Sequence, residues 1–147
     1  MRVLVQEAPF DLAEETARFA KGEGGSGAIV TFTGVVRDND AGTLSAMEIE
    51  HYPGMTEKAL SDIAQQAVTR FDLQDALVIH RHGRLVPGEQ IMMVATAARH
   101  RRSAFEAAEF LMDYLKSRAP FWKCEITSEG EAWVAAKDED EAALNRW

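Results

Sequence analysis

The segment QIMMVATAARHRRSAFEAAEFLMDYLKSRAPFWKCEIT, residues 90–127, decides the fold. Its first nine residues are mostly apolar and predict a buried strand. Residues 103–117 then carry apolar side chains at helical spacing, and Pro120 ends this helix because proline has no amide hydrogen to donate. Residues 121–127 alternate in polarity and predict a second strand. A long helix between two strands therefore forms the centre of the predicted fold.

The rest of the chain adds further strands and helices around this centre. Strands are predicted over residues 2–6, 28–36, 44–52, 76–82 and 131–136, and helices over residues 11–20, 56–71 and 138–146. We expect the strand at 28–36 to be buried and paired with the strand at 44–52, and Thr56 to cap the second helix. Residues 22–27, which are rich in glycine, predict a flexible loop. The pattern indicates an α+β fold with a mostly antiparallel sheet and three main helices, in a single domain over residues 1–147.

Composition excludes several classes of function. The chain has 147 residues, 46% of them hydrophobic and 27% charged, with a net charge of −8, which opposes non-specific binding to nucleic acid or anionic lipid. Its apolar runs fall short of the roughly 20 residues that span a bilayer, so we expect no membrane segment and a cytoplasmic protein. The single cysteine, Cys124, excludes an internal disulfide. His80 and His82 share a predicted strand face, but the histidines have no zinc spacing.

The charge is unevenly distributed. Residues 99–123 carry six basic and three acidic side chains, although the whole chain is acidic. Arg99, His100, Arg101 and Arg102 lie where a strand meets the N-terminus of the long helix. Free amide groups attract anions there, whereas cations are unfavourable for the helix itself. The cluster therefore indicates binding of a phosphate or carboxylate; the alternative is that these side chains point outward and pair with acidic residues.

Three further basic residues are candidates for a functional site. Lys116 lies at the helix C-terminus, where a cation also suits the helix dipole. Lys123 has aromatic neighbours and nearby cations, which can lower its pKa and allow it to act as a nucleophile or proton carrier. Arg37 follows a strand and suits bidentate phosphate binding, or is simply a surface residue. His100 and Lys116 are separated by roughly 24 Å of helix, so they serve different sites or one site shared across a symmetric dimer.

Several motifs together resemble the large, catalytic subunits of molybdopterin synthase. They are TFTG at residues 31–34 with Arg37, EHYPGM at 50–55, IHR at 79–81, HRRSAFEA at 100–107, MDYLK at 112–116 and RAPFWK at 118–123. The resemblance implies an α/β-hammerhead-like fold and a sulfurtransferase that forms the dithiolene of molybdopterin from cyclic pyranopterin monophosphate. It also implies that the sulfur arrives as a thiocarboxylate on the C-terminal Gly-Gly of a small ubiquitin-like subunit.

The same resemblance implies an assembly and a set of site residues. The chain would form the homodimeric core of a heterotetramer, and neither a cofactor nor a metal is implied. Lys116 and Lys123 would be catalytic and would also contact substrate. The further substrate-binding residues would be Arg37, His100, Arg101, Cys124 and Glu125, with Phe32, Met112 and Pro120 as walls. The His100–Arg101 pair would come from the neighbouring protomer. Arg102, Val35 and Cys124 depart from the residues expected of the family.

Two other functions remain open at this point. A non-catalytic adaptor could bind a ubiquitin-like Gly-Gly tail, although tail binding alone does not need both Lys116 and Lys123. A generic phosphometabolite-binding domain would need no protein partner, so co-purification with a small protein ending in Gly-Gly would distinguish it.

Overall fold

The computed structural model describes residues 1–22, 24–135 and 137–147. The strands are β1 Arg2–Gln6, β2 Ala28–Val35, β3 Leu44–His51, β4 Asp75–Arg81, β5 Gly83–Leu85, β6 Gln90–Ala98, β7 Phe121–Thr127 and β8 Gly130–Trp133. The helices are α1 Leu12–Ala20, α2 Met55–Phe71, α3 Arg101–Arg118 and α4 Asp138–Ala143, with a 3₁₀ turn at Leu144–Arg146. The predicted α+β class is confirmed. The predicted loop at 22–27 and strand at 131–136 each include a residue, Glu23 or Ala136, that lies outside the described residues.

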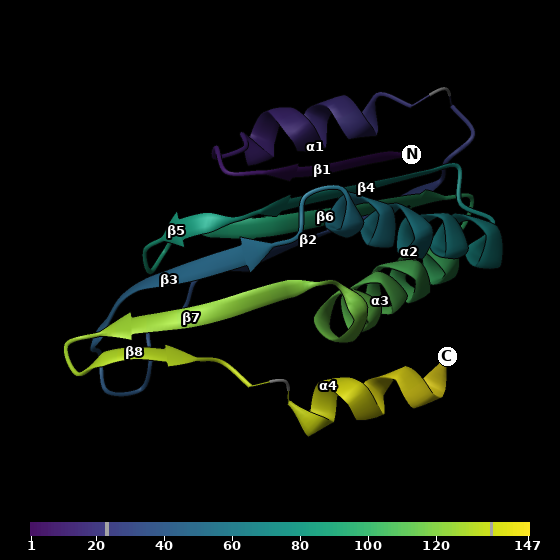
Figure 1. Cartoon of the computed structure of the whole chain (residues 1–147). Coiled ribbons are helices and arrows are strands. Elements are labelled where there is room, and N and C mark those ends of the chain that lie inside the picture. Colours follow the sequence, from purple (N-terminus) through teal and green to yellow (C-terminus); the bar gives the residue numbers. More distant parts are fainter. Residues whose placement is uncertain (23, 136) are drawn as a thin grey trace.

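The strands form two sheets, with the orders β1-β4-β6-β2 and β5-β3-β7-β8 (Figure 1). β1 and β4 pair in parallel, and the other described pairs are antiparallel. The predicted pairing of strands 28–36 and 44–52 is wrong, because β2 pairs with β6 while β3 pairs with β5 and β7. The polar connection after β2 leads the chain into the other sheet instead of a hairpin. β5, with three residues, is too short to leave a periodic pattern.

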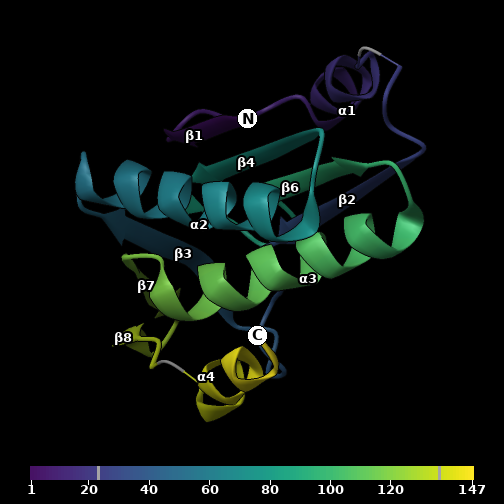
Figure 2. The ribbon, with the colours of Figure 1, turned by 90° about the vertical axis from the view of Figure 1, so that its right-hand side faces the viewer.

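Helices cover both faces of the first sheet. α1 lies on one face, where Leu77, Ile79, Met93 and Ala95 form a buried cluster. α2 and α3 lie side by side on the other face (Figure 2), where Phe110 and Leu111 pack against Val78 and Val94. Because alternate residues of β4 and β6 face these two layers, residues 76–79 of β4 and 91–95 of β6 are continuously apolar instead of alternating. Among the described residues, none of the helices is long and apolar enough to cross a bilayer.

β2 lies at the edge of the first sheet, so the prediction of a buried strand over residues 28–36 is wrong. Its side chains Ile29, Phe32 and Val35 are 39%, 43% and 49% exposed. A β-branched and aromatic composition favours a strand, but it does not determine whether that strand lies at the centre or the edge of a sheet. An exposed apolar edge is a surface on which another chain can pair.

The start of α2 fixes the turn between α3 and β7. Gly54, with φ of 83°, is the N-cap, and its N–H donates to the Glu57 carboxylate at 2.6 Å. Thr56 is therefore not the cap, contrary to the prediction. Its buried hydroxyl accepts a hydrogen bond from the Tyr52 N–H at 3.0 Å and donates to the Pro120 carbonyl at 3.4 Å. α2 is thereby tied to the point where the chain leaves α3.

Candidate active site

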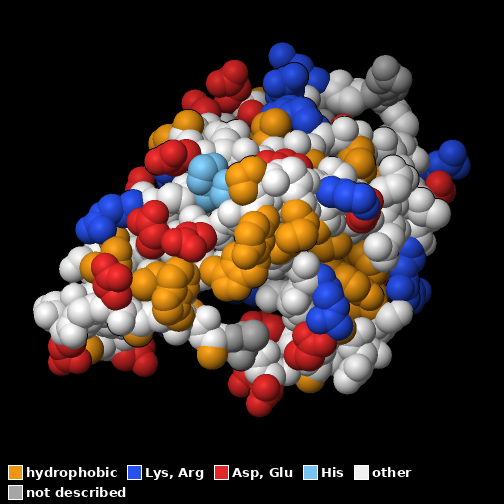
Figure 3. All heavy atoms as spheres, in the orientation of Figure 1, with side chains coloured by type: hydrophobic (Ala, Val, Ile, Leu, Met, Phe, Trp, Pro, Cys, Tyr) orange, Lys and Arg blue, Asp and Glu red, His pale blue; other side chains and the backbone are white. Residues whose placement is uncertain are grey.

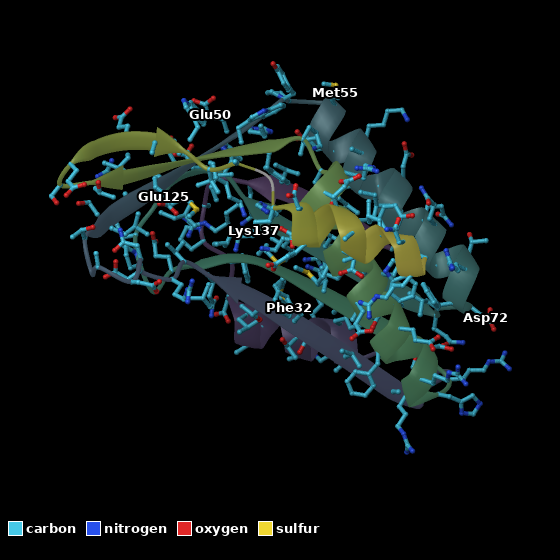
Figure 4. All side chains as sticks on the ribbon, turned by 90° about the horizontal axis from the view of Figure 1, so that it is seen from below. Phe32, Glu50, Met55, Asp72, Glu125 and Lys137 are labelled. Carbon is cyan, nitrogen blue, oxygen red and sulfur yellow. The ribbon has the colours of Figure 1, made fainter. Side chains whose placement is uncertain are left out.

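A cavity of about 340 Å³ lies between β2, β6, the C-terminal half of α3 and the start of β7. Its lining residues are Phe32, Thr33, Gly34, Val35, His80, Ile91, Met92, Met112, Leu115, Lys116, Ala119, Phe121 and Lys123. Figure 4 views the molecule from below and labels Phe32 on β2 and Glu125 on β7, two strands that border this region. The cavity is mainly apolar with a few polar groups, which is typical of a small-ligand site.

Both predicted lysines line this cavity. Met112, Lys116 and Ala119 recur every three or four residues on α3, so they lie on the face of the helix that borders the cavity. Pro120 then ends the helix, and β7 begins at Phe121. Lys123 is two residues further along β7 and therefore shares a strand face with Phe121. One turn of the chain thus brings the two amines into the same cavity.

The surroundings of Lys123 alter its protonation. The side chain is half-buried, and burial is the main cause that lowers its pKa below the ordinary lysine value; the charge of Lys116 is the next. Lys116 itself is exposed at the cavity mouth. A lowered pKa increases the fraction of neutral amine near pH 7, and a neutral amine can take a proton or act as a nucleophile.

His80, on β4, is a cavity residue that the sequence analysis did not assign to the site. Its ring is buried and stacks on Phe121, with centroids 3.7 Å apart and planes inclined by 17°. Its Nδ1 lies 2.7 Å from the Arg81 carbonyl oxygen. The pKa of His80 is lowered to about 3, mainly by burial; the hydrogen bond to Arg81 opposes this shift, and the charges of Lys123 and Lys116 contribute to it. Two signals were available: the IHR motif at residues 79–81, and a polar residue at the end of the apolar run over residues 76–79.

The low pKa of His80 makes the fold sensitive to acid. The unfolded chain binds a proton on this ring near pH 6.5, whereas the folded chain binds it only near pH 3. Between these values the unfolded state holds more protons, so the free energy of unfolding falls as the pH falls, by up to about 1.4 kcal/mol per pH unit. We expect His80→Asn to flatten this dependence in urea denaturation series between pH 4 and pH 7. If the free energy of unfolding of the variant depends on pH as strongly as that of the wild type, then His80 is not a buried neutral ring.

The three predicted phosphate-binding residues do not line the cavity. Arg37, His100 and Arg101 are exposed, and His100 is the N-cap of α3 without a side-chain hydrogen bond. α3 runs unbroken over 18 residues, so its two ends stay separated by more than 20 Å. Arg102 pairs with Glu106 at 3.0 Å, which fits the alternative of an outward side chain for that residue. A role in phosphate binding remains a prediction for the other three.

The remaining predicted site residues differ in whether they line the cavity. Phe32 and Met112 line it as predicted, while Pro120 lies between two lining residues, Ala119 and Phe121. Cys124 is buried and, by strand alternation, faces away from Lys123. Glu125 shares the face of Lys123 but lies beyond the cavity lining. Substrate contact by Cys124 and Glu125 therefore remains a prediction.

His80 and His82 lie in separate hollows, so they do not form the pair considered from the sequence. His82 follows β4 and stacks against His51, with ring centroids 4.1 Å apart, in a hollow that also includes Glu48 and Glu50. Within residues 1–22, 24–135 and 137–147, no three His, Cys, Asp or Glu side chains are placed to hold a metal ion.

Comparison with known proteins identifies the family. The family model described as "MoaE protein" matches residues 5–118. The molybdopterin synthase catalytic subunit of Cereibacter sphaeroides is 69% identical over 147 residues, with both chains covered completely. The solved structure of the molybdopterin biosynthesis MoaE protein from Burkholderia ambifaria has a TM-score of 0.85 and 51% identity, covering 99% of this chain and 97% of that one.

A more distant structure has the same fold. It is a protein–protein complex of subunits 1 and 2 of molybdopterin-converting factor from Helicobacter pylori, with a TM-score of 0.76 and 18% identity. The match covers 92% of this chain and 90% of that one. Because the family model spans most of the sequence and close relatives match over the full length, the chain belongs to the MoaE protein family, the catalytic subunits of molybdopterin synthase, which are sulfurtransferases that form molybdopterin.

Proposed function

We propose that the cavity receives the C-terminal Gly-Gly tail of a small ubiquitin-like subunit and that sulfur passes from its thiocarboxylate to cyclic pyranopterin monophosphate. The observation that carries this proposal is the placement of Lys116 and Lys123 in one mainly apolar cavity. Two cationic side chains attract an anionic thiocarboxylate, and glycines without side chains fit between walls such as Phe32 and Met112.

The two lysines have different surroundings and therefore different roles in this proposal. Lys116 stands at the cavity mouth and donates hydrogen bonds to the acyl oxygen of the terminal glycine, where negative charge develops during acyl transfer. Lys123 is half-buried with a lowered pKa, which suits proton transfer. The lowered pKa of Lys123 speaks against the alternative of a non-catalytic adaptor, because binding a tail does not require it.

A second copy of the chain completes the site in this proposal. Arg37, His100 and Arg101 hold the phosphate and pterin, and the His100–Arg101 pair comes from the neighbouring protomer. The length of α3 supports this arrangement, because within one chain the helix keeps His100 and Arg101 far from Lys116. The exposed edge strand β2 offers an apolar surface for such a contact. The assembly is a homodimer of single-domain chains with one small subunit at each end, and we place it in the cytoplasm.

Exposed aromatic residues close to Lys123 support a protein partner. Trp122 and Tyr52 are 43% and 54% exposed, and their rings meet edge to face at 4.8 Å. On the face of the molecule that Figure 3 shows, hydrophobic side chains gather across the middle, with acidic side chains beside them. Exposed aromatic groups of this kind are common in protein interfaces. The Helicobacter pylori complex described above shows two subunits assembled in a protein of the same fold.

Reconstitution tests the proposed function. The purified chain, mixed with precursor and a small protein that ends in a Gly-Gly thiocarboxylate, is expected to yield molybdopterin, recognised by mass from its two dithiolene sulfurs. The matched control is the same small protein with an ordinary carboxylate, which should give no product. Binding of the thiocarboxylated protein without any product would instead support the adaptor.

A further inference from the structure

The polar side chains of the cavity differ in what they can offer a ligand. Protonated Lys116 and Lys123 only donate hydrogen bonds, and the hydroxyl of Thr33 donates or accepts. His80 is the fourth polar side chain in the lining. A bound peptide tail or pterin carries N–H groups of its own, and protonated lysines cannot accept hydrogen bonds from these groups.

The contacts of His80 determine which of its nitrogen atoms is free. A carbonyl oxygen only accepts hydrogen bonds, so the 2.7 Å contact with the Arg81 carbonyl requires the proton to be on Nδ1. In the neutral ring, Nε2 then keeps its lone pair. Among the described residues, Nε2 of His80 has no hydrogen-bond partner. Of the side-chain nitrogen and oxygen atoms of these residues that lack a partner, the one that is fully buried is His51 Nδ1, so Nε2 of His80 is not fully buried. Nε2 of His80 is therefore accessible, and the cavity is the space that the ring borders.

We propose that His80 is a substrate-positioning residue whose Nε2 accepts a hydrogen bond from an N–H group of the ligand bound beside Lys116 and Lys123. This inference rests on the proposed function of the cavity. The stacking on Phe121 and the bond to Arg81 fix the ring, so the acceptor has a defined direction. A ligand that fills the cavity excludes solvent from Nε2, and binding is weakened unless the ligand donates a hydrogen bond to this atom.

Two variants separate this role from a structural one. In His80→Asn, the side-chain amide N–H takes the place of Nδ1–H and can still donate to Arg81, but nothing stands at Nε2. In His80→Gln, the longer side chain places an amide near the Nε2 position and can offer its oxygen there, while the Nδ1 donor is lost. We expect His80→Asn to reduce kcat/KM roughly tenfold at pH 7, with a lower urea midpoint because the smaller side chain loses the stacking on Phe121. His80→Gln should recover part of this activity despite a lower midpoint.

The pattern of loss identifies the hydrogen-bond donor. An increase in KM for the precursor, with unchanged affinity for the small subunit, would assign the N–H group to the pterin. Weaker binding of the small subunit, measured by calorimetry, would assign it to the glycine tail. His80→Asn with wild-type kinetics, or activity that falls only in proportion to stability in both variants, would overturn the inference. An inactive wild-type reconstitution would instead count against the proposed function, because it does not depend on either variant.

Discussion

Replacement of Lys116 by alanine is expected to reduce molybdopterin formation by about a hundredfold to a thousandfold while the protein stays folded. Loss of one hydrogen-bond donor that stabilises developing negative charge costs roughly 10²- to 10³-fold in enzymes, and Lys116 is placed for this role. The side chain is exposed at the cavity mouth, so its loss leaves no buried void. Single-turnover product formation with thiocarboxylated partner and precursor measures the effect, and circular dichroism checks the fold.

Two companion variants sharpen this test. Lys58→Ala removes an exposed lysine on α2 that pairs with Asp62 at 2.8 Å, and it should leave product formation unchanged. Lys116→Arg keeps the positive charge but cannot become a neutral amine at any accessible pH. Substantial activity in the arginine variant would show that charge is sufficient, whereas an inactive variant would require the amine itself. Normal product yield from Lys116→Ala would remove Lys116 from the catalytic machinery.

Mixing two inactive variants is expected to restore activity. If one site combines Lys116 of one protomer with Arg101 of the other, then Lys116→Ala and Arg101→Ala homodimers each lack both sites. A heterodimer of the two variants places both substitutions in one site and leaves the second site intact. Random mixing produces half heterodimers, so the mixture should recover about a quarter of wild-type activity.

The heterodimer itself gives a stricter measurement. Co-expression with two different affinity tags allows its purification, and the isolated species should have about half of the wild-type activity per dimer. The matched control is a heterodimer in which one chain carries both substitutions, because each of its two sites then has one defect. An isolated heterodimer of the single variants that stays as inactive as its parents would place each site within one chain.

Features encoded locally could be predicted from the sequence. The succession of β6, α3 and β7 lies in one continuous stretch, and Pro120 marks the helix end, so Lys116 and Lys123 could be placed at that turn. Strand partners depend on packing between distant segments instead. The composition of residues 28–36 favours a strand, but it does not determine that β2 lies at the edge of its sheet or that β3 joins the other sheet.

The same limit applies to the site. Alternation along β7 predicts that Lys123 and Cys124 face opposite ways, but not which face borders a cavity, because this depends on where α3 lies. His80 was noted for a strand face shared with His82 and for the IHR motif, but not as a cavity residue, since the sequence does not show that its ring stacks on Phe121. His80 and Phe121 are far apart in the sequence, so no local pattern indicates their contact. In the proposed assembly His100 and Arg101 act at the cavity of a second chain, and a contact between two chains leaves no pattern in the sequence of one.

The tie between Thr56 and Pro120 has an energetic consequence for catalysis. Lys116 and Lys123 are seven positions apart, on either side of a turn that α2 holds in place. The conformational entropy of bringing the two amines together is therefore lost during folding, not when the ligand binds. Ligand binding energy remains available for the reacting groups. The cavity is in this sense preorganised: the two lysines meet within each separate chain, and in the proposed assembly the second chain has only to supply His100 and Arg101.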